Sequence, residues 1–119
     1  MATGSSRLVV TDDGGITRVG FVDRNILEEA FIQRIGDEIS AIVDEQANPK
    51  LLLNFENVEH LSSAALGTLI TINQKVRQKG GQLRLCNIDK QIYEVFVITK
   101  LNKLFQIHDT VDQAVKSFK

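Results

Sequence analysis

The chain has 119 residues, of which 43% are hydrophobic and 24% are charged, and its formal net charge is −1. This length and composition predict one globular domain, and the near-neutral charge excludes the basic footprint of a DNA- or RNA-binding protein. The single cysteine, Cys86, excludes an internal disulfide and a cysteine-rich metal site. We therefore expect no nucleic-acid partner and no metal or other cofactor.

The N-terminal residues 1–6 are short and polar, and they lack the apolar core of a signal peptide. We expect them to form a flexible tail that precedes a folded domain over residues 7–119. No apolar run approaches the roughly 20 residues that a membrane helix needs. These patterns predict a soluble, cytoplasmic protein that has no membrane partner.

The first part of the domain predicts a β-hairpin followed by a long helix. Strands are expected at residues 7–11 and 16–22, on either side of the tight-turn sequence Asp12-Asp13-Gly14-Gly15. A helix is expected over residues 27–45, where Gly36 indicates close approach to a neighbouring element or a helix defect. The apolar stripe of this helix should consist of Leu27, Phe31, Ile35, Ile39 and Ile42.

The centre of the chain predicts a buried strand that leads into an amphipathic helix. Residues 51–55 form a nearly continuous apolar run, which is typical of a strand buried on both faces. After a connection over residues 56–61, apolar residues recur at helical spacing as far as Lys79. Ser62 or Ser63 should be the N-cap, because a hydroxyl there accepts a bond from an unpaired backbone N–H. Either serine would lie at the positive end of the helix dipole, where a phosphate is electrostatically tolerated.

The remaining segments alternate between strands and helices. Strands are expected at residues 82–86 and 104–108, with helices at 90–99 and after Asp109 or Thr110. The third helix should carry Ile92, Tyr93, Phe96 and Val97 on one side, and Cys86 should be buried in its strand. The apolar group Val97, Ile98 and Leu101 should lie mostly in the core, with part of it left exposed for docking. The pattern predicts an α/β fold with a mainly parallel sheet of four to five strands, an N-terminal hairpin and about four helices.

In this order, the elements and their motifs resemble the STAS-domain family, to which the anti-sigma factor antagonists belong. The resemblance is carried by Asn54, Phe55, Val58, His60, Leu61, Ser63, Leu66 and Gly67, and by the tail from Gly80-Gly81 to Ala114. It implies a single STAS-like domain in which Ser63 matches the serine that a partner kinase phosphorylates. Two residues depart from the family pattern: Ser62 replaces an aspartate, and Ala65 replaces a glycine.

The resemblance implies a non-enzymatic, partner-switching function. The unphosphorylated chain would bind an anti-sigma factor or serine kinase of the histidine-kinase-like ATPase type, and phosphorylation at Ser63, or alternatively at Ser62, would release it. A serine phosphatase is a further implied partner, and ATP would belong to the kinase because this chain has no phosphate-binding loop. The expected contact residues are Glu56, Asn57, Glu59, His60, Ser62, Ser63 and Ala64.

The sequence allows two other functions. A scaffold or ligand-sensing STAS module in a larger signalling assembly would use the same surface without phosphorylation, and the aspartate replaced by Ser62 favours it. A serine hydrolase is disfavoured, because no Gly-x-Ser-x-Gly sequence surrounds Ser63 and nothing places His60 as its base. His60 and His108 are expected to be connector residues. Asp12-Asp13 and Asp23 are expected to be turn and strand-end residues, in loops that could border the partner contact.

Overall fold

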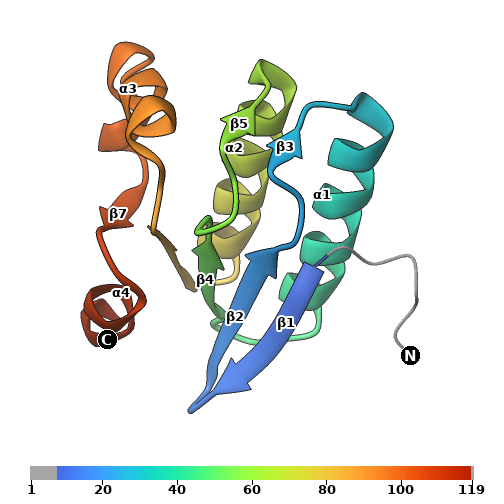
Figure 1. Ribbon diagram of the computed structural model, residues 1–119. Helices are drawn as coiled ribbons and strands as arrows, with labels where there is room; N and C mark the ends of the chain where they lie inside the picture. Colours follow the sequence, from blue (N-terminus) through green and yellow to red (C-terminus); the bar gives the residue numbers. More distant parts are fainter. Residues whose placement is uncertain (1–7, 119) are drawn as a thin grey trace.

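The computed structural model describes residues 8–118, and the expected tail over residues 1–6 lies outside the described residues. Its core element is a five-stranded sheet with strand order β1-β2-β4-β6-β7 (Figure 1). The strands are β1 (Leu8–Asp13), β2 (Ile16–Phe21), β4 (Lys50–Asn54), β6 (Gln82–Cys86) and β7 (Gln106–His108). β1 and β2 are antiparallel, whereas every other neighbouring pair is parallel. The predicted α/β architecture with an N-terminal hairpin is therefore confirmed.

Helices cover both faces of this sheet. The four helices are α1 (Glu29–Asp44), α2 (Ser63–Gln78), α3 (Lys90–Ile98) and α4 (Val111–Ser117). Leu51 and Leu53 of β4 lie in the main hydrophobic core with the buried faces of α1 and α2, whereas Leu52 packs with Ala114 of α4. Successive strand residues point to opposite faces, and this explains why the central run of the sequence is apolar throughout.

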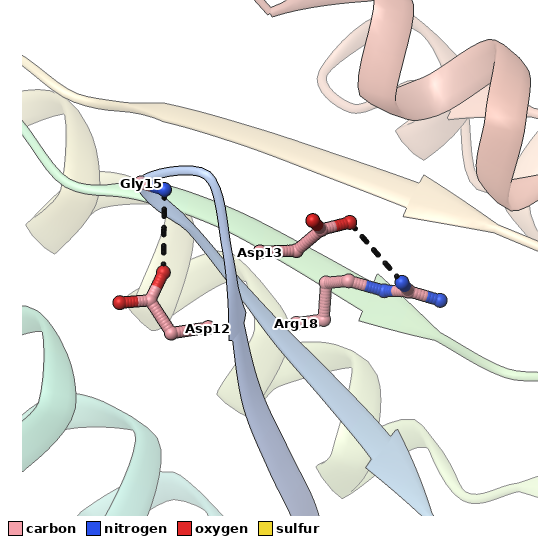
Figure 2. Close-up of polar contacts among 4 residues, drawn as sticks. All are labelled: Asp12, Asp13, Gly15 and Arg18. Atoms are coloured by element: carbon pink, nitrogen blue, oxygen red, sulfur yellow. Dashed lines mark hydrogen bonds and ion pairs between the residues drawn. The ribbon is translucent and has the colours of Figure 1, made fainter.

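The hairpin turn consists of two glycines. Gly14 and Gly15 both have positive φ, at +61° and +90°, which other residues adopt only with strain. Because these two residues make the whole turn, β1 continues through Asp12 and Asp13 instead of ending at residue 11 as predicted. Figure 2 shows the Asp12 carboxylate accepting a hydrogen bond from the Gly15 N–H at 3.3 Å, and Asp13 paired with Arg18 at 3.3 Å.

The first helix begins two residues later than predicted, and its predicted stripe was right at Ile35 and Ile39 but wrong at Leu27. α1 begins at Glu29, and the side chain of Leu27 is 53% exposed. Its buried stripe consists of Ile32, Ile35, Ile39 and Val43. The physical reason is a short strand, β3 (Asn25–Ile26), which pairs in parallel with β5 (His60–Leu61) and holds this segment extended. Neither of these short strands was predicted.

The C-terminal part of the sheet also differs from the prediction. Ile92 and Phe96 of α3 are buried, and Leu101 packs against the core, but Val97 is 46% exposed and Ile98 is 79% exposed. The expectation that this apolar group lies mostly in the core was therefore wrong, and its exposed part is the larger one. The helix α3 packs at the edge of the molecule, and only the side that carries Ile92 and Phe96 is buried. A 3₁₀ helix over Leu101–Lys103 then shortens the last strand to Gln106–His108. No helix within residues 8–118 is long and apolar enough to cross a membrane.

Candidate functional site

The serine loop, defined here as residues 56–62, lies at the carboxyl edge of the sheet, which is the end where the carboxyl ends of the parallel strands meet. It follows β4 and leads directly into α2 (Figure 1). Asp23 follows the end of the parallel strand β2 and therefore belongs to this edge. Asp12 and Asp13 precede β2 beside the hairpin turn, at the opposite end of the strands from the serine loop.

Polar side chains fix the first half of the serine loop to the strand ends. The Asn54 Oδ1 atom accepts hydrogen bonds from the Glu56 N–H and from the Asn87 side-chain amide, each at 3.0 Å. The Asn57 side-chain amide donates to the Phe21 carbonyl at 3.2 Å. The loop is therefore tied to β2, β4 and β6 together.

Backbone hydrogen bonds join the second half of the loop to the segment that leads into α1. The Arg24 carbonyl accepts from the N–H groups of Glu59 at 2.7 Å and His60 at 3.1 Å, and the Ile26 carbonyl accepts from the Ser62 N–H at 3.1 Å. Val58 is buried beneath this junction. The starts of both long helices consequently form one surface.

The two adjacent serines occupy different positions at the start of α2. Ser62 is the N-cap: its backbone is extended, it is half-buried, and its Oγ accepts a hydrogen bond from the Ala65 N–H at 3.2 Å. Ser63 is the first helical residue and is exposed. Within residues 8–118, the Ser63 hydroxyl has no hydrogen-bond partner. Of the two N-cap candidates, the structure selects Ser62 and leaves the Ser63 hydroxyl open to solvent.

The surroundings of Ser63 are small side chains and a mainly acidic rim. Ala64 and Gly67 are exposed on the same helix, and a Cβ added to Gly67 would meet nothing within 4 Å. Glu56 and Glu59 are exposed on the loop, with Glu59 4.0 Å from Arg24. The first turn of α2 holds no acidic residue, so its own side chains do not neutralise the partial positive charge of the helix start.

The predicted contact residues lie together on the serine loop and at the start of α2, although they differ in exposure. Glu56, Asn57, Glu59, His60, Ser63 and Ala64 are exposed, while Ser62 is half-buried. The base of a serine hydrolase would accept a hydrogen bond from the serine hydroxyl. In the described part of the chain, His60 makes no hydrogen bond to Ser63. Among residues 8–118, no group of three His, Cys, Asp or Glu side chains is placed to hold a metal ion.

Two exposed apolar residues near the loop were missed. Val22 and Leu27, 55% and 53% exposed, lie on the segment between β2 and α1 that is bonded to the serine loop. Leu27 directly follows Ile26, whose carbonyl binds Ser62. The acidic pair Glu28-Glu29 could have revealed its exposure, because acidic residues favour the first turn of a helix and would place the start of α1 after Leu27.

A comparison with known families agrees with this fold. The sequence model of the STAS domain family matches residues 27–114. The chain therefore belongs to the STAS domain family.

Two relatives carry names that describe an activity. One, from Bordetella bronchiseptica and named anti-sigma factor antagonist BtrV, is 25% identical over 81% of this chain and 82% of its own length. Another, from Thermotoga neapolitana and named a homologue of the anti-sigma factor antagonist TM1081, is 31% identical over 56% of this chain and 59% of its own length.

Solved structures share the fold. An anti-sigma-factor antagonist (STAS) domain protein from Planctomyces limnophilus superposes with a TM-score of 0.85 and 20% identity, over 92% of this chain and 96% of that one. The Bacillus cell fate determinant SpoIIAA, in its phosphorylated form, gives a TM-score of 0.70 and 15% identity, over 92% of this chain and 96% of that one.

Proposed function

We propose that this chain is an anti-sigma factor antagonist that acts by partner switching, with Ser63 as its regulatory phosphorylation site. The relatives named as antagonists support the class of function. The observation that carries the choice of residue is the exposed Ser63 hydroxyl, which has no intramolecular partner in the described chain, beside a Ser62 hydroxyl that caps α2. A structural neighbour, SpoIIAA, has been solved in a phosphorylated form.

The proposed switch follows from the physics of a charge at this position. A phosphoserine adds about −1.5 to −2 charges. The start of α2 stabilises that charge inside the domain, because its N–H groups are directed at it. A partner packed against Ser63, Ala64 and Leu27 would have to remove water from the phosphate, which is strongly unfavourable. Modification therefore releases the partner without unfolding the domain.

The partner we propose is a cytoplasmic anti-sigma factor that is also a serine kinase of the histidine-kinase-like ATPase type. It would transfer the γ-phosphoryl group of ATP to the Ser63 oxygen, with ADP leaving and the hydroxyl proton passing to a base of the kinase. A serine phosphatase would hydrolyse the ester and restore the binding form. In this scheme the chain is the substrate and the regulator, and it catalyses nothing.

The test is a pull-down from native cytosol with and without ATP, in which bound proteins and phosphosites are identified by mass spectrometry. We expect one ATPase-type partner to bind, and added ATP to place a single phosphate on Ser63 and release the partner. The Ser62→Ala variant should still be modified, whereas Ser63→Ala should not. The proposal would be contradicted if the Ser63→Ala variant were still phosphorylated. It would also be contradicted if the amount of bound partner were the same with and without ATP.

The second candidate is a scaffold or ligand-sensing STAS module, and the serine at position 62 favours it because the family pattern has an aspartate there. Such a module would use the same surface around the serine loop. Its partners would be retained in the presence of ATP, and its intact mass would show no phosphate adduct after incubation with candidate kinases.

A further inference from the structure

A cavity of about 310 Å³ lies at the carboxyl edge of the sheet, where β6 and β7 end. It is lined by the connection after β6, by the first turn of α3 and by the end of β7, through Ile88, Lys90, Tyr93, Ile107, His108 and Asp109. Ligand pockets begin at about this size, and in open sheets they form outside the carboxyl ends of the strands. The proposed phosphorylation switch does not use this cavity.

Four polar side chains of the cavity are unpaired within the described part of the chain. Lys90, Tyr93, His108 and Asp109 make no side-chain hydrogen bond or ion pair with any residue there. Lys90 and Asp109 carry opposite charges, yet they do not pair with each other. The Nε2 atom of His108 is buried without a hydrogen-bond partner, which is unfavourable. Polar groups that converge on a cavity without pairing there are available to a ligand.

The charges around the cavity come from different elements. Lys90 is the first residue of α3, so its ammonium group lies at the positive end of that helix. The nearby carboxylate of Asp89 is already used, because it accepts a backbone N–H of the same helix at 3.0 Å. Asp109 supplies a carboxylate from the segment after β7, and Ile88 and Ile107 add apolar surface. The cavity therefore offers a cation, an anion and an apolar wall together.

We propose that this cavity binds a small zwitterion of the amino-acid class, with its carboxylate on Lys90 and its ammonium group on Asp109. An aliphatic side chain of the ligand packs against Ile88 and Ile107. A simple anion would leave Asp109 unpaired beside it, and a simple cation would do the same to Lys90, so the cavity discriminates against both. Both charged residues are exposed, so each ion pair is weak and we expect a dissociation constant in the millimolar range.

One residue connects the cavity to the serine loop. Asn87 directly precedes Ile88, and its side-chain amide donates to Asn54 Oδ1, which also accepts the Glu56 N–H. This site would give the second candidate function, the ligand-sensing module, its ligand. Binding does not rest on phosphorylation or on a partner protein. Its test and the test of the proposed function can therefore fail independently.

An NMR titration of the isotope-labelled chain with leucine tests the proposal. The backbone amide signals of residues 88–93 and 107–109 should shift and saturate in the millimolar range. Isocaproate is leucine without its amino group, and isoamylamine is leucine without its carboxylate. Each should bind about fivefold more weakly than leucine, because each loses one exposed ion pair.

Charge-removing variants assign the two ion pairs. Lys90→Gln should weaken leucine binding about fivefold without weakening isoamylamine, and Asp109→Asn should do so without weakening isocaproate. Lys103→Gln and Asp112→Asn are matched controls that remove the same charges from exposed positions outside the cavity, and they should bind leucine like the wild type. Circular dichroism checks that all four variants are folded.

Three results would overturn the proposal. The first is a wild type whose signals show no saturable shift with leucine, or show it away from the cavity. The second is isocaproate or isoamylamine binding as tightly as leucine, since the ligand would then be a simple ion. The third is a Lys90→Gln or Asp109→Asn protein that binds leucine with unchanged affinity.

Discussion

Two adjacent serines at the start of α2 have the same chemistry but different environments. Ser62 has its oxygen committed to the Ala65 N–H, and Ser63 has its oxygen in solvent. The difference arises because a helix has one N-cap position, and the residue after it already has helical dihedral angles. Ser62 therefore stabilises the helix, whereas the next residue, Ser63, has an accessible hydroxyl.

We predict that Ser62→Ala lowers the free energy of unfolding by about 1 kcal/mol, the usual loss for an N-cap serine. Ser63→Ala should stay within about 0.5 kcal/mol of the wild type, because the hydroxyl makes no intramolecular hydrogen bond in the described chain. Urea unfolding followed by circular dichroism measures both. Equal losses in the two variants would contradict the assignment of the cap to Ser62.

Under the proposed function, Ser63→Asp should weaken partner binding by about tenfold or more, since the partner must desolvate a carboxylate. Ser63→Ala should bind with wild-type affinity and stay bound in the presence of ATP. Calorimetry with the captured partner gives both dissociation constants. Gln91→Asp is a control that adds the same charge in the first turn of α3, and it should have no effect.

Leu27 provides a separate test of the surface next to Ser63. Leu27→Ser should reduce partner affinity by about tenfold, because burying a leucine is worth about 1.5–3 kcal/mol. The free energy of unfolding should change little, since this side chain is already 53% exposed. Ile98→Ser removes a more exposed apolar side chain on α3 and should leave binding unchanged. If both variants changed the partner affinity equally, Leu27 would not be part of the contact.

Among the elements, the close contact between α1 and α2 depends on a glycine. A Cβ added to Gly36 would lie 2.9 Å from Thr68 Cγ2, so the predicted close approach to a neighbour is confirmed. Thr68 lies in the second turn of α2, just beyond the serines. The position of the α2 start relative to α1 is therefore partly set by this contact.

The same substitution at two helix glycines should have opposite effects. Gly36→Leu should destabilise the protein by about 1–3 kcal/mol, because the larger side chain overpacks the α1–α2 contact. Gly67→Leu should stabilise it by about 0.5 kcal/mol, because leucine is the better helix former and the site is open. Thermal or urea unfolding measures both changes. A stabilised Gly36→Leu protein would show that the helices separate easily.

At the scale of the whole molecule, the sheet buries a titratable group between its layers. Cys86 is wholly buried and packs with Ile16, Leu52 and Ala114 on the α4 side. Burial raises the pKa of its thiol from 9.0 to about 11; Arg18 opposes this shift and Glu56 adds to it. A buried neutral thiol is chemically inert, so it should react with thiol reagents only when the protein unfolds.

This shift makes stability depend on pH. Below about pH 9 the thiol is protonated in both states, and between pH 9 and about 11 the unfolded chain loses the proton while the folded chain keeps it. The stabilising contribution is therefore lost as the pH rises through this range. We expect the stability difference between the wild type and Cys86→Ala to shrink from pH 8 to pH 11 in urea unfolding. A constant difference would contradict the raised pKa.

Much of the fold could be predicted from the sequence, because its evidence is local. Apolar spacing marks helices and strands, paired glycines mark the hairpin, and the run at residues 51–55 marks a strand buried on both faces. The same patterns carry the resemblance to the STAS family and identify the two serines as the start of α2. Periodicity and turn chemistry act over a few residues, which is the range that a single sequence displays.

What the tertiary structure alone decided depends on partners distant in the chain. β3 and β5 each contribute two residues, too few for a periodic pattern, and they form only because Asn25–Ile26 and His60–Leu61 meet in space. Because these strands pair, α1 begins only at Glu29 and Leu27 stays exposed. The same pairing joins the segment that carries Leu27 to the serine loop. The sheet edge likewise leaves Val97 and Ile98 uncovered. Burial is set by which elements meet, and hydrophobicity along the chain does not contain that information.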